Sequence, residues 1–371
     1  MVSLFDMQPR LIHYASRLVT HEDNFDLPGI QRFAEYFKIY GKGVVPNDRT
    51  GTVRFPVRTR TLFPLPRFQE TTKTFEELCD NRAKELLAKA ERLGIPLYTF
   101  WSGGIDSTLV LISLLKNATN EQMKNIVVMM STESILEYPL FYEQHIRGKL
   151  RTESAINFPL LLGGEYLIVN GEHNDQLFGS DIVAKFIDVC GLDAIHKPYS
   201  RDTIFTFYNT LLNDSNSTNF YMNLFERVRG ASPVPIGTNY LFFWWINFAL
   251  KWQTVSIRTL AFASRRVTNK ITATYVENNY APFFRTDEFQ LWSMSNLDKK
   301  IKADWRSYKW VCKDIIYDYT KDAEYRDEKV KRGSLHFLVV QQKIWPYIDE
   351  HFHFSELMDR KQYYEPDNDF I

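Results

Sequence analysis

The chain of 371 residues is long enough for one large or two ordinary domains with substantial apolar cores. Its 45 basic and 45 acidic side chains cancel, so net charge gives no reason to expect a nucleic-acid partner. Aromatic residues form 15% of the sequence, which argues against disorder, and no apolar run of about eighteen residues predicts a membrane span. We therefore expect a folded protein that does not enter a membrane.

The N-terminal extension, residues 1–74, carries one predicted helix over 30–40. A basic stretch without any acid follows at 49–67, and its prolines favour extended loops or short edge strands over helix. This stretch is either an arm for a partner or a cover on a sheet edge, and both interpretations stay open.

Residues 75–180 form the predicted core domain, which begins with a helix over 75–93. A strand over 95–100 leads into Trp-Ser-Gly-Gly-Ile-Asp-Ser-Thr, and an apolar run over 109–115 continues as helix. Glycines let the backbone approach an anion, and the N–H groups of the first helical turn attract it. The alternative is a Ser/Gly turn that caps an ordinary helix. We predict a phosphate site with the candidate ligands Ser102, Gly103, Gly104, Asp106, Ser107 and Thr108.

A second loop is expected at the same edge of the sheet. After a strand over 126–130, a strand over 165–170 runs into Gly-Glu-His-Asn-Asp-Gln-Leu-Phe-Gly. Parallel strands present such loops together at their carboxyl ends. Asp106 and Asp175 would then share one Mg²⁺ that also binds the phosphates. Taken alone, Asp175 is better explained as a helix N-cap, and its pairing with Asp106 favours the metal interpretation.

The two loops carry a family resemblance. Ser-Gly-Gly-Ile-Asp-Ser resembles the SGGxDS pyrophosphate loop of the N-type ATP pyrophosphatases, and the second loop resembles the GEGxDELFGG element of the asparagine synthetase and β-lactam synthetase branch. The resemblance implies a PP-loop fold of the α/β class, Rossmann-like, with a parallel sheet. It also implies cleavage of ATP between the α- and β-phosphates, with ATP and Mg²⁺ as cofactors. Glu172 matches the family position that helps to deprotonate the nucleophile.

Two downstream segments extend the resemblance. Residues 281–284 resemble the family's PFLD segment, and residues 308–313 resemble its K-x-x-L-R element. The lysine of that element stabilises charge during catalysis, so Lys309 is the second candidate catalytic residue beside Glu172. Lys313, one helical turn later, is expected on the same side. The alternative is that both lysines lie on an amphipathic helix and face water.

The sequence also departs from the family. Gln176 and Ser180 replace an acid and a glycine, and Arg285 replaces the aspartate of PFLD, with Asp287 two places on. No glutaminase domain is expected, because the chain starts Met-Val-Ser-Leu and its earliest cysteine is Cys79. Nitrogen would come from free ammonia, an amine substrate or a separate glutaminase.

Residues 181–371 are expected to be mostly helical and to bind the acceptor. Between Glu226 and Glu277 basic residues mix with tryptophans and no acid occurs. This pattern suits a nucleotide, nucleic acid or polycarboxylate, whereas the tryptophans themselves favour a buried core. We expect a mobile, solvated segment at 321–332 and a frayed acidic end at 365–369.

The leading hypothesis is an AMP-forming ligase that joins a carboxylate, or a similar oxygen, to ammonia or an amine. A PP-loop enzyme that modifies a nucleotide or nucleic-acid base is the second hypothesis, and a non-catalytic nucleotide-binding module is the third. The scattered Cys79, Cys190 and Cys312 form no metal pattern and indicate reduced thiols, hence a cytoplasmic location.

Overall fold

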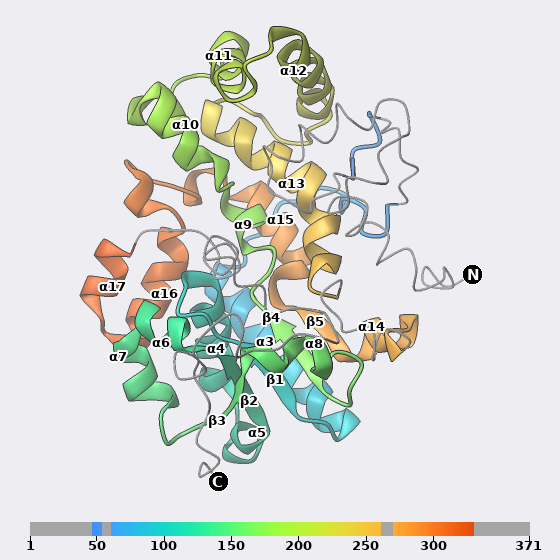
Figure 1. Ribbon diagram of the computed structural model, residues 1–371, viewed down its shortest axis with the longest axis vertical. Coiled ribbons are helices and arrows are strands. Elements are labelled where there is room, and N and C mark those ends of the chain that lie inside the picture. Colours follow the sequence, from blue (N-terminus) through green and yellow to red (C-terminus); the bar gives the residue numbers. More distant parts are fainter. Residues whose placement is uncertain (1–46, 54–60, 261–269, 330–371) are drawn as a thin grey trace, which may run out of the picture.

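The computed structural model describes residues 47–53, 61–260 and 270–329 (Figure 1). Its centre is a five-stranded sheet of order β3-β2-β1-β4-β5 in which every neighbouring pair is parallel. The predicted α/β class with a parallel sheet is therefore confirmed. The strands are β1 (Leu97–Phe100), β2 (Ile126–Met130), β3 (Arg151–Ser154), β4 (Leu167–Asn170) and β5 (Tyr280–Pro282).

Alternating side chains of the strands enter two apolar clusters, one on each face of the sheet. Leu97, Val128 and Val169 face the cluster that contains α3 (Phe75–Leu93) and α4 (Ile105–Asn117). Tyr98, Val127 and Ile168 face the cluster that contains residues of α14 (Ala273–Asn279). Both faces are covered, as continuous apolar strands require. The bounds of α3 and β2 match the predicted 75–93 and 126–130.

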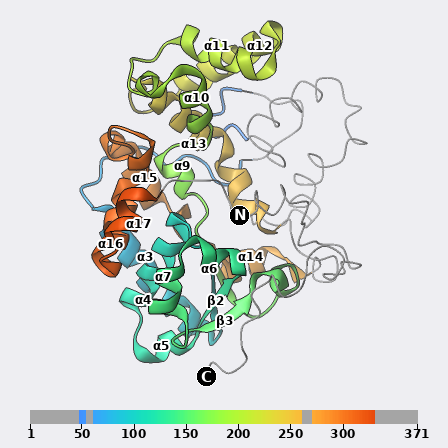
Figure 2. The same cartoon turned by 60° about the vertical axis from the view of Figure 1, so that its left-hand side comes forward.

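Further helices surround this core, and α10, α11 and α12 form a group that α13 connects to the sheet layer (Figures 1 and 2). The expected helical character after residue 181 holds in the described part. These helices are α5 (Asn120–Lys124), α6 (Thr132–Glu137), α7 (Pro139–Phe141), α8 (Phe158–Leu161), α9 (Asn174–Phe178), α10 (Ile182–Cys190), α11 (Arg201–Leu212), α12 (Ser215–Gly230), α13 (Asn239–Arg258), α15 (Asp287–Ser295), α16 (Trp310–Thr320) and α17 (Ala323–Glu328). In the described ranges, none of the helices is long and apolar enough to cross a membrane.

The tryptophans of α13 belong to the core. Trp244, Trp245 and Trp252 are fully buried, which confirms the core interpretation of this span. Of the basic residues nearby, Arg229 pairs with Glu226 at 2.8 Å and Lys251 is buried. Arg227 and Lys270 are exposed, and Arg265 and Arg266 lie outside the described residues.

The basic stretch before the core packs on α13. The backbone N–H of Asn47 donates to Leu250 O at 2.9 Å, and the Arg49 guanidinium donates to Phe63 O at 2.7 Å and to Phe248 O at 3.1 Å. The described part of this stretch thus packs on α13, whereas the predicted cover was on a sheet edge. The predicted helix over 30–40 lies outside the described residues.

The charged segment over 321–329 is anchored by one aromatic side chain. Tyr325 of α17 is buried and stacks on Tyr138 with ring centroids 3.8 Å apart. Its hydroxyl donates to Gly103 O at 3.0 Å. The charged residues Lys321, Glu324, Asp327 and Glu328 are exposed, as expected of a solvated segment, so the departure from that expectation is confined to Tyr325. Residues 330–332 and the acidic end at 365–369 lie outside the described part.

Side chains of α13 and the segment after α15 hold the carbonyl groups at the end of α9. Asn247 Nδ2 donates to Gly179 O at 2.6 Å, and Tyr240 OH donates to Phe178 O at 2.8 Å. The buried Lys300 Nζ donates to Leu177 O at 2.8 Å. A five-residue helix has almost no internal hydrogen bonds, so these external donors satisfy its free carbonyls.

Replacing Asn247 by alanine should lower the free energy of unfolding by about 2–3 kcal/mol, because buried partners at Gly179 and Gln176 lose their hydrogen bonds. Urea denaturation followed by circular dichroism measures this loss. The exposed Asn223→Ala is the matched control and should change stability by less than about 0.5 kcal/mol. An equal change in the free energy of unfolding for the two variants would show that the buried hydrogen bonds of Asn247 do not stabilise the fold.

Candidate functional site

The loop between β1 and α4 has the backbone expected of an anion-binding turn. Gly103 has φ +71°, and a Cβ there would lie 2.5 Å from Ser134 O. Gly104 is the N-cap of α4 and carries no side-chain cap. Both the left-handed backbone and the lack of space therefore require glycine at 103, whereas the backbone at 104 suits any residue. The free N–H groups of the first turn of α4 point out of this loop.

The three hydroxyl groups of this loop differ in burial and in their hydrogen-bond partners. Ser102 Oγ and Ser107 Oγ lie 2.9 Å apart, and Ser107 Oγ also accepts from the Ser102 N–H at 3.0 Å. Thr108 is fully buried and accepts from Trp101 Nε1 at 3.1 Å. Ser102 and Ser107 thus lie at the loop itself, whereas Thr108 supports the loop from beneath.

The second loop, after β4, packs directly against the first. A Cβ on Gly171 would lie 3.1 Å from the backbone carbon of Asp106. Asn174 Nδ2 donates to Asp106 Oδ1 at 2.6 Å. His173 has φ 79° and is buried, with Nε2 2.7 Å from Ser256 Oγ. The two loops therefore meet at the carboxyl edge of the sheet, as the parallel strand order requires.

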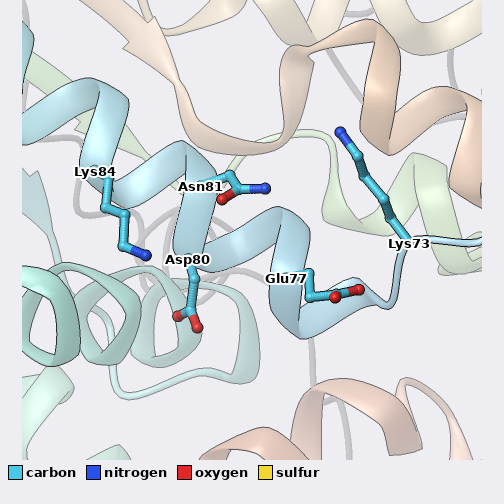
Figure 3. Close-up of a pocket in the computed structure, with 5 residues that line it drawn as sticks. All are labelled: Lys73, Glu77, Asp80, Asn81 and Lys84. Carbon is cyan, nitrogen blue, oxygen red and sulfur yellow. The ribbon is translucent and has the colours of Figure 1, made fainter.

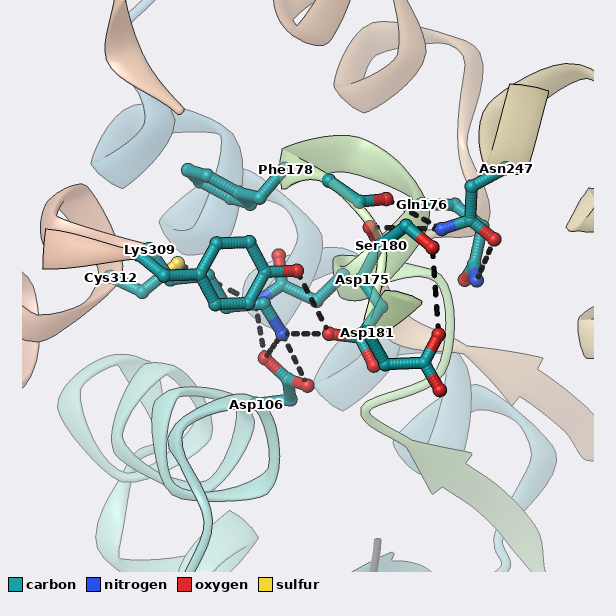
Figure 4. A network of polar contacts seen from close by, with 12 residues as sticks. Asp106, Asp175, Gln176, Phe178, Ser180, Asp181, Asn247, Lys309 and Cys312 are labelled. Atoms are coloured by element: carbon teal, nitrogen blue, oxygen red, sulfur yellow. Dashed lines mark hydrogen bonds and ion pairs between the residues drawn. The ribbon is translucent and has the colours of Figure 1, made fainter. Parts of the chain in front are cut away.

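Lys309 joins the two loops (Figure 4). Its Nζ lies 2.5 and 2.7 Å from the two carboxylate oxygens of Asp106 and 2.7 Å from Asp175 Oδ1. The lysine side chain is 1% exposed, whereas those of Asp106 and Asp175 are 25% and 31% exposed. A buried cation is thus compensated by two carboxylates that remain accessible to solvent on their other sides. Three candidate residues from distant segments form one cluster.

The electrostatics of the cluster follow from this packing. Burial alone would lower the pKa of Lys309, but Asp106 and Asp175 outweigh it and hold the pKa above its ordinary value. Tyr308 OH donates to Asp175 Oδ1 at 3.1 Å, and burial, followed by the charge of Asp175, raises the pKa of this tyrosine. Lys309 therefore stays charged at neutral pH. Its φ of 59° places it in the left-handed region as the N-cap of α16.

Glu172 lies in the second loop, half-buried, and its N–H donates to Asn170 Oδ1 at 3.2 Å. It follows β4 directly, so it shares the sheet edge with Asp106 and Asp175. Lys313 does not join them: its Nζ donates to Arg306 O at 2.6 Å and to Lys329 O. The expectation that Lys309 and Lys313 face the same side was wrong, because Lys309 precedes the helix with a left-handed backbone and helical spacing does not apply to it.

The departures from the family motifs have distinct surroundings. Gln176 is buried and donates to Asn247 Oδ1 at 3.3 Å, so it contacts α13. Asp287, in the first turn of α15, accepts from Gln290 Nε2 at 3.1 Å. Arg285 lies just beyond β5, in a 3₁₀ turn over Phe283–Arg285.

Sequence reasoning missed several contributors to this site. Asn174 holds Asp106, Tyr308 holds Asp175, and Tyr325 holds the Gly103 carbonyl. Asn174 and Tyr308 stand inside the quoted motifs, directly beside Asp175 and Lys309, so their position was the available signal. Tyr325 gave none.

A separate hollow lies on the outer surface of α3, lined by Lys73, Glu77, Asp80, Asn81 and Lys84 (Figure 3). Asp80 pairs there with Lys116 at 2.9 Å, near the last turn of α4. The loop residues lie at the first turn of that helix, so the hollow is at the opposite end of α4.

No protein-family model matches the chain, and no curated protein matches it. Among the residues described, no group of three or more histidine, cysteine, aspartate or glutamate side chains could hold a metal ion on its own. All three cysteines are free thiols.

Gly103→Ala should lower the free energy of unfolding by about 2–4 kcal/mol, from the left-handed backbone and the clash with Ser134 O. Gly104→Ala is the matched control. Its φ is −78° and the nearest atom is Ser102 Oγ at 3.3 Å, so it should cost less than about 1 kcal/mol. Urea unfolding of both variants tests the difference, and equal losses would refute this account of the loop.

The contributions of Lys313 and Lys309 to the free energy of unfolding should depend on pH in opposite ways, because the pKa of Lys313 is lowered and that of Lys309 is raised. Burial lowers the pKa of Lys313 to about 8, below its unfolded value of about 10.4. Between these values the unfolded chain binds a proton that the folded chain does not, so this group should raise the free energy of unfolding by up to about 3 kcal/mol as pH rises. Lys313→Met should remove that rise.

Lys309→Met is the control for this pH profile. The raised pKa of Lys309 means that its contribution is fully present below the unfolded pKa and is lost only at higher pH. Wild type and Lys309→Met should therefore differ by a constant amount between pH 8 and 10. The pKa shifts given for the two lysines would be contradicted if the difference in stability between wild type and Lys309→Met changed with pH over this range. They would also be contradicted if the difference between wild type and Lys313→Met did not change.

Proposed function

We propose that the protein is an ATP-dependent, AMP-forming ligase similar to asparagine synthetase. It adenylates a carboxylate, or a similar oxygen, and joins it to ammonia or an amine. The observation that carries the proposal is the contact of Lys309 Nζ with both Asp106 and Asp175. A cation held between two loops at the carboxyl edge of a parallel sheet lies where a polyphosphate would bind.

The donor set fits Mg²⁺. This ion binds proteins through one or two carboxylates and takes its other ligands from water and phosphates. Lys309 Nζ lies within 2.7 Å of both Asp106 and Asp175, so the two carboxylates are close together, and an ion would bind them on the sides that remain exposed to solvent. Bound there, Mg²⁺ would offset the charge of the leaving pyrophosphate.

The loop between β1 and α4 would hold the pyrophosphate portion of ATP. The N–H groups of Gly103 and Gly104, the first turn of α4 and the hydroxyls of Ser102 and Ser107 supply donors. Thr108 supports this loop through Trp101. A substrate oxygen attacks the α-phosphorus, and the bond to the β-phosphate breaks.

The second half of the reaction would use the other side of the site. The amine attacks the acyl carbon, and AMP leaves with the bonding electron pair. Glu172, at the end of β4, takes the proton from the amine. Lys309 stabilises negative charge on the phosphate or on the tetrahedral oxygen, where one well-placed charge contributes about 3 kcal/mol. We place this activity in the cytoplasm, where its thiols stay reduced.

ATP cleavage with Mg²⁺ tests the proposal, with AMP and pyrophosphate separated from ADP and phosphate. The assay uses pools of carboxylic acids, amines and nucleic acids. Asp106→Asn and Asp175→Asn should each lower pyrophosphate release by about 100-fold or more. Asp181→Asn, an exposed acid that follows the second loop, should keep the activity. Formation of ADP, or normal turnover in the Asp106 and Asp175 variants, would refute the proposal.

A further inference from the structure

Arg285 occupies the position where the resembling family has an aspartate, and its surroundings are those of an anion-binding group. Its guanidinium lies 5.1 Å from the ring centroid of Phe63 and 6.0 Å from that of Tyr280. The side chain is partly buried between these rings. The two rings orient the guanidinium plane but accept no strong hydrogen bond from it.

Arg49 shows what a buried structural arginine looks like in the same chain. Its guanidinium donates to Phe63 O, Phe248 O, Pro64 O and Gln290 Oε1, so its donors are used. Within the described residues, Arg285 makes no hydrogen bond and no ion pair of this kind. Burial is the main reason why the pKa of Arg285 is lowered to about 10; Tyr280 opposes this shift and Arg82 adds to it. A desolvated cation without an acid is costly to keep in a fold.

Arg285 lies at the same sheet edge as the acid–lysine cluster. Asn170 at the end of β4 pairs in register with Pro282 of β5, so Glu172 and Arg285 follow neighbouring strands. Tyr280 connects them, because its hydroxyl accepts from Asn170 Nδ2 at 3.1 Å while its ring faces Arg285. No acid occurs in the sequence over 49–69 or over 227–276, the stretches that contain Phe63 and precede Tyr280. Two further cations, Arg82 and Lys89, interact electrostatically with Arg285.

We propose that Arg285 binds an anionic group of the acceptor, a carboxylate or a phosphate, separate from the oxygen that is activated. The naming of this ligand as the acceptor rests on the proposed ligase function; the anion site itself does not. The guanidinium presents a planar set of donors that binds either group through two parallel hydrogen bonds. An aspartate at this position, as in the family motif, would repel an anionic group. Arg285 would therefore give this chain a preference for anionic acceptors that the family motif does not provide.

The test measures anion binding in the absence of ATP. Thermal unfolding is followed for the full chain in phosphate, in succinate and in chloride at equal ionic strength. Phosphate or succinate should raise the melting temperature of the wild type above that in chloride, since binding to the folded state stabilises it. Arg285→Gln should lose this increase. Arg227→Gln, which removes an exposed arginine of α12, is the matched control and should keep it.

Each outcome decides the question. An increase with phosphate alone assigns a phosphorylated acceptor, and an increase with succinate alone assigns a carboxylic acid. No increase in the wild type, or the same increase in Arg285→Gln, overturns the anion site. If Arg285→Gln does not fold, titration calorimetry of Arg285→Lys replaces it: affinity at least about tenfold weaker supports paired hydrogen bonds, and unchanged affinity contradicts them. Failure of ATP cleavage leaves these results untouched.

Discussion

The compensation of one buried cation organises the carboxyl edge of this protein. Lys309 is 1% exposed, and an ammonium group in that position is tolerated only because Asp106 and Asp175 neutralise it. The three residues come from α4, α9 and the turn before α16, so the ion pairs fix the relative positions of these helices. Everything proposed for the site, from phosphate binding to charge stabilisation, depends on this arrangement.

Much of this arrangement could be predicted from the sequence. Apolar runs identified β1, β2 and β4, the first and last of them bounded by glycines, and parallel strands bring their following loops to one edge. The meeting of Asp106 with Asp175 follows from that rule alone. The position of Lys309 does not follow from the order of the strands. Lys309 lies 203 residues from Asp106, and its contact depends on a left-handed backbone that no local pattern indicates. The same feature explains why Lys313, spaced as a helical neighbour, faces another direction.

The aromatic core explains why the short helix that bears Asp175 can be stable. Tyr240 and Asn247 of α13 hold the carbonyls after Asp175, and the tryptophans of the same helix bury it deeply. The helix that bears Asp175 has five residues, too few to be stable by itself. The loop is thus held by tertiary packing. The tryptophans were expected in a buried core, and they fix this helix by packing there.

The hydrogen bond from Tyr325 to the Gly103 carbonyl has a consequence for the loop between β1 and α4. A trans peptide unit is planar, so its C=O and its N–H point in opposite directions. By holding the oxygen of Gly103, Tyr325 also sets the direction of the Gly104 N–H in the same peptide unit. A residue near the far end of the described chain therefore determines which way a backbone donor of the first loop is aimed, and the peptide cannot rotate without breaking that bond.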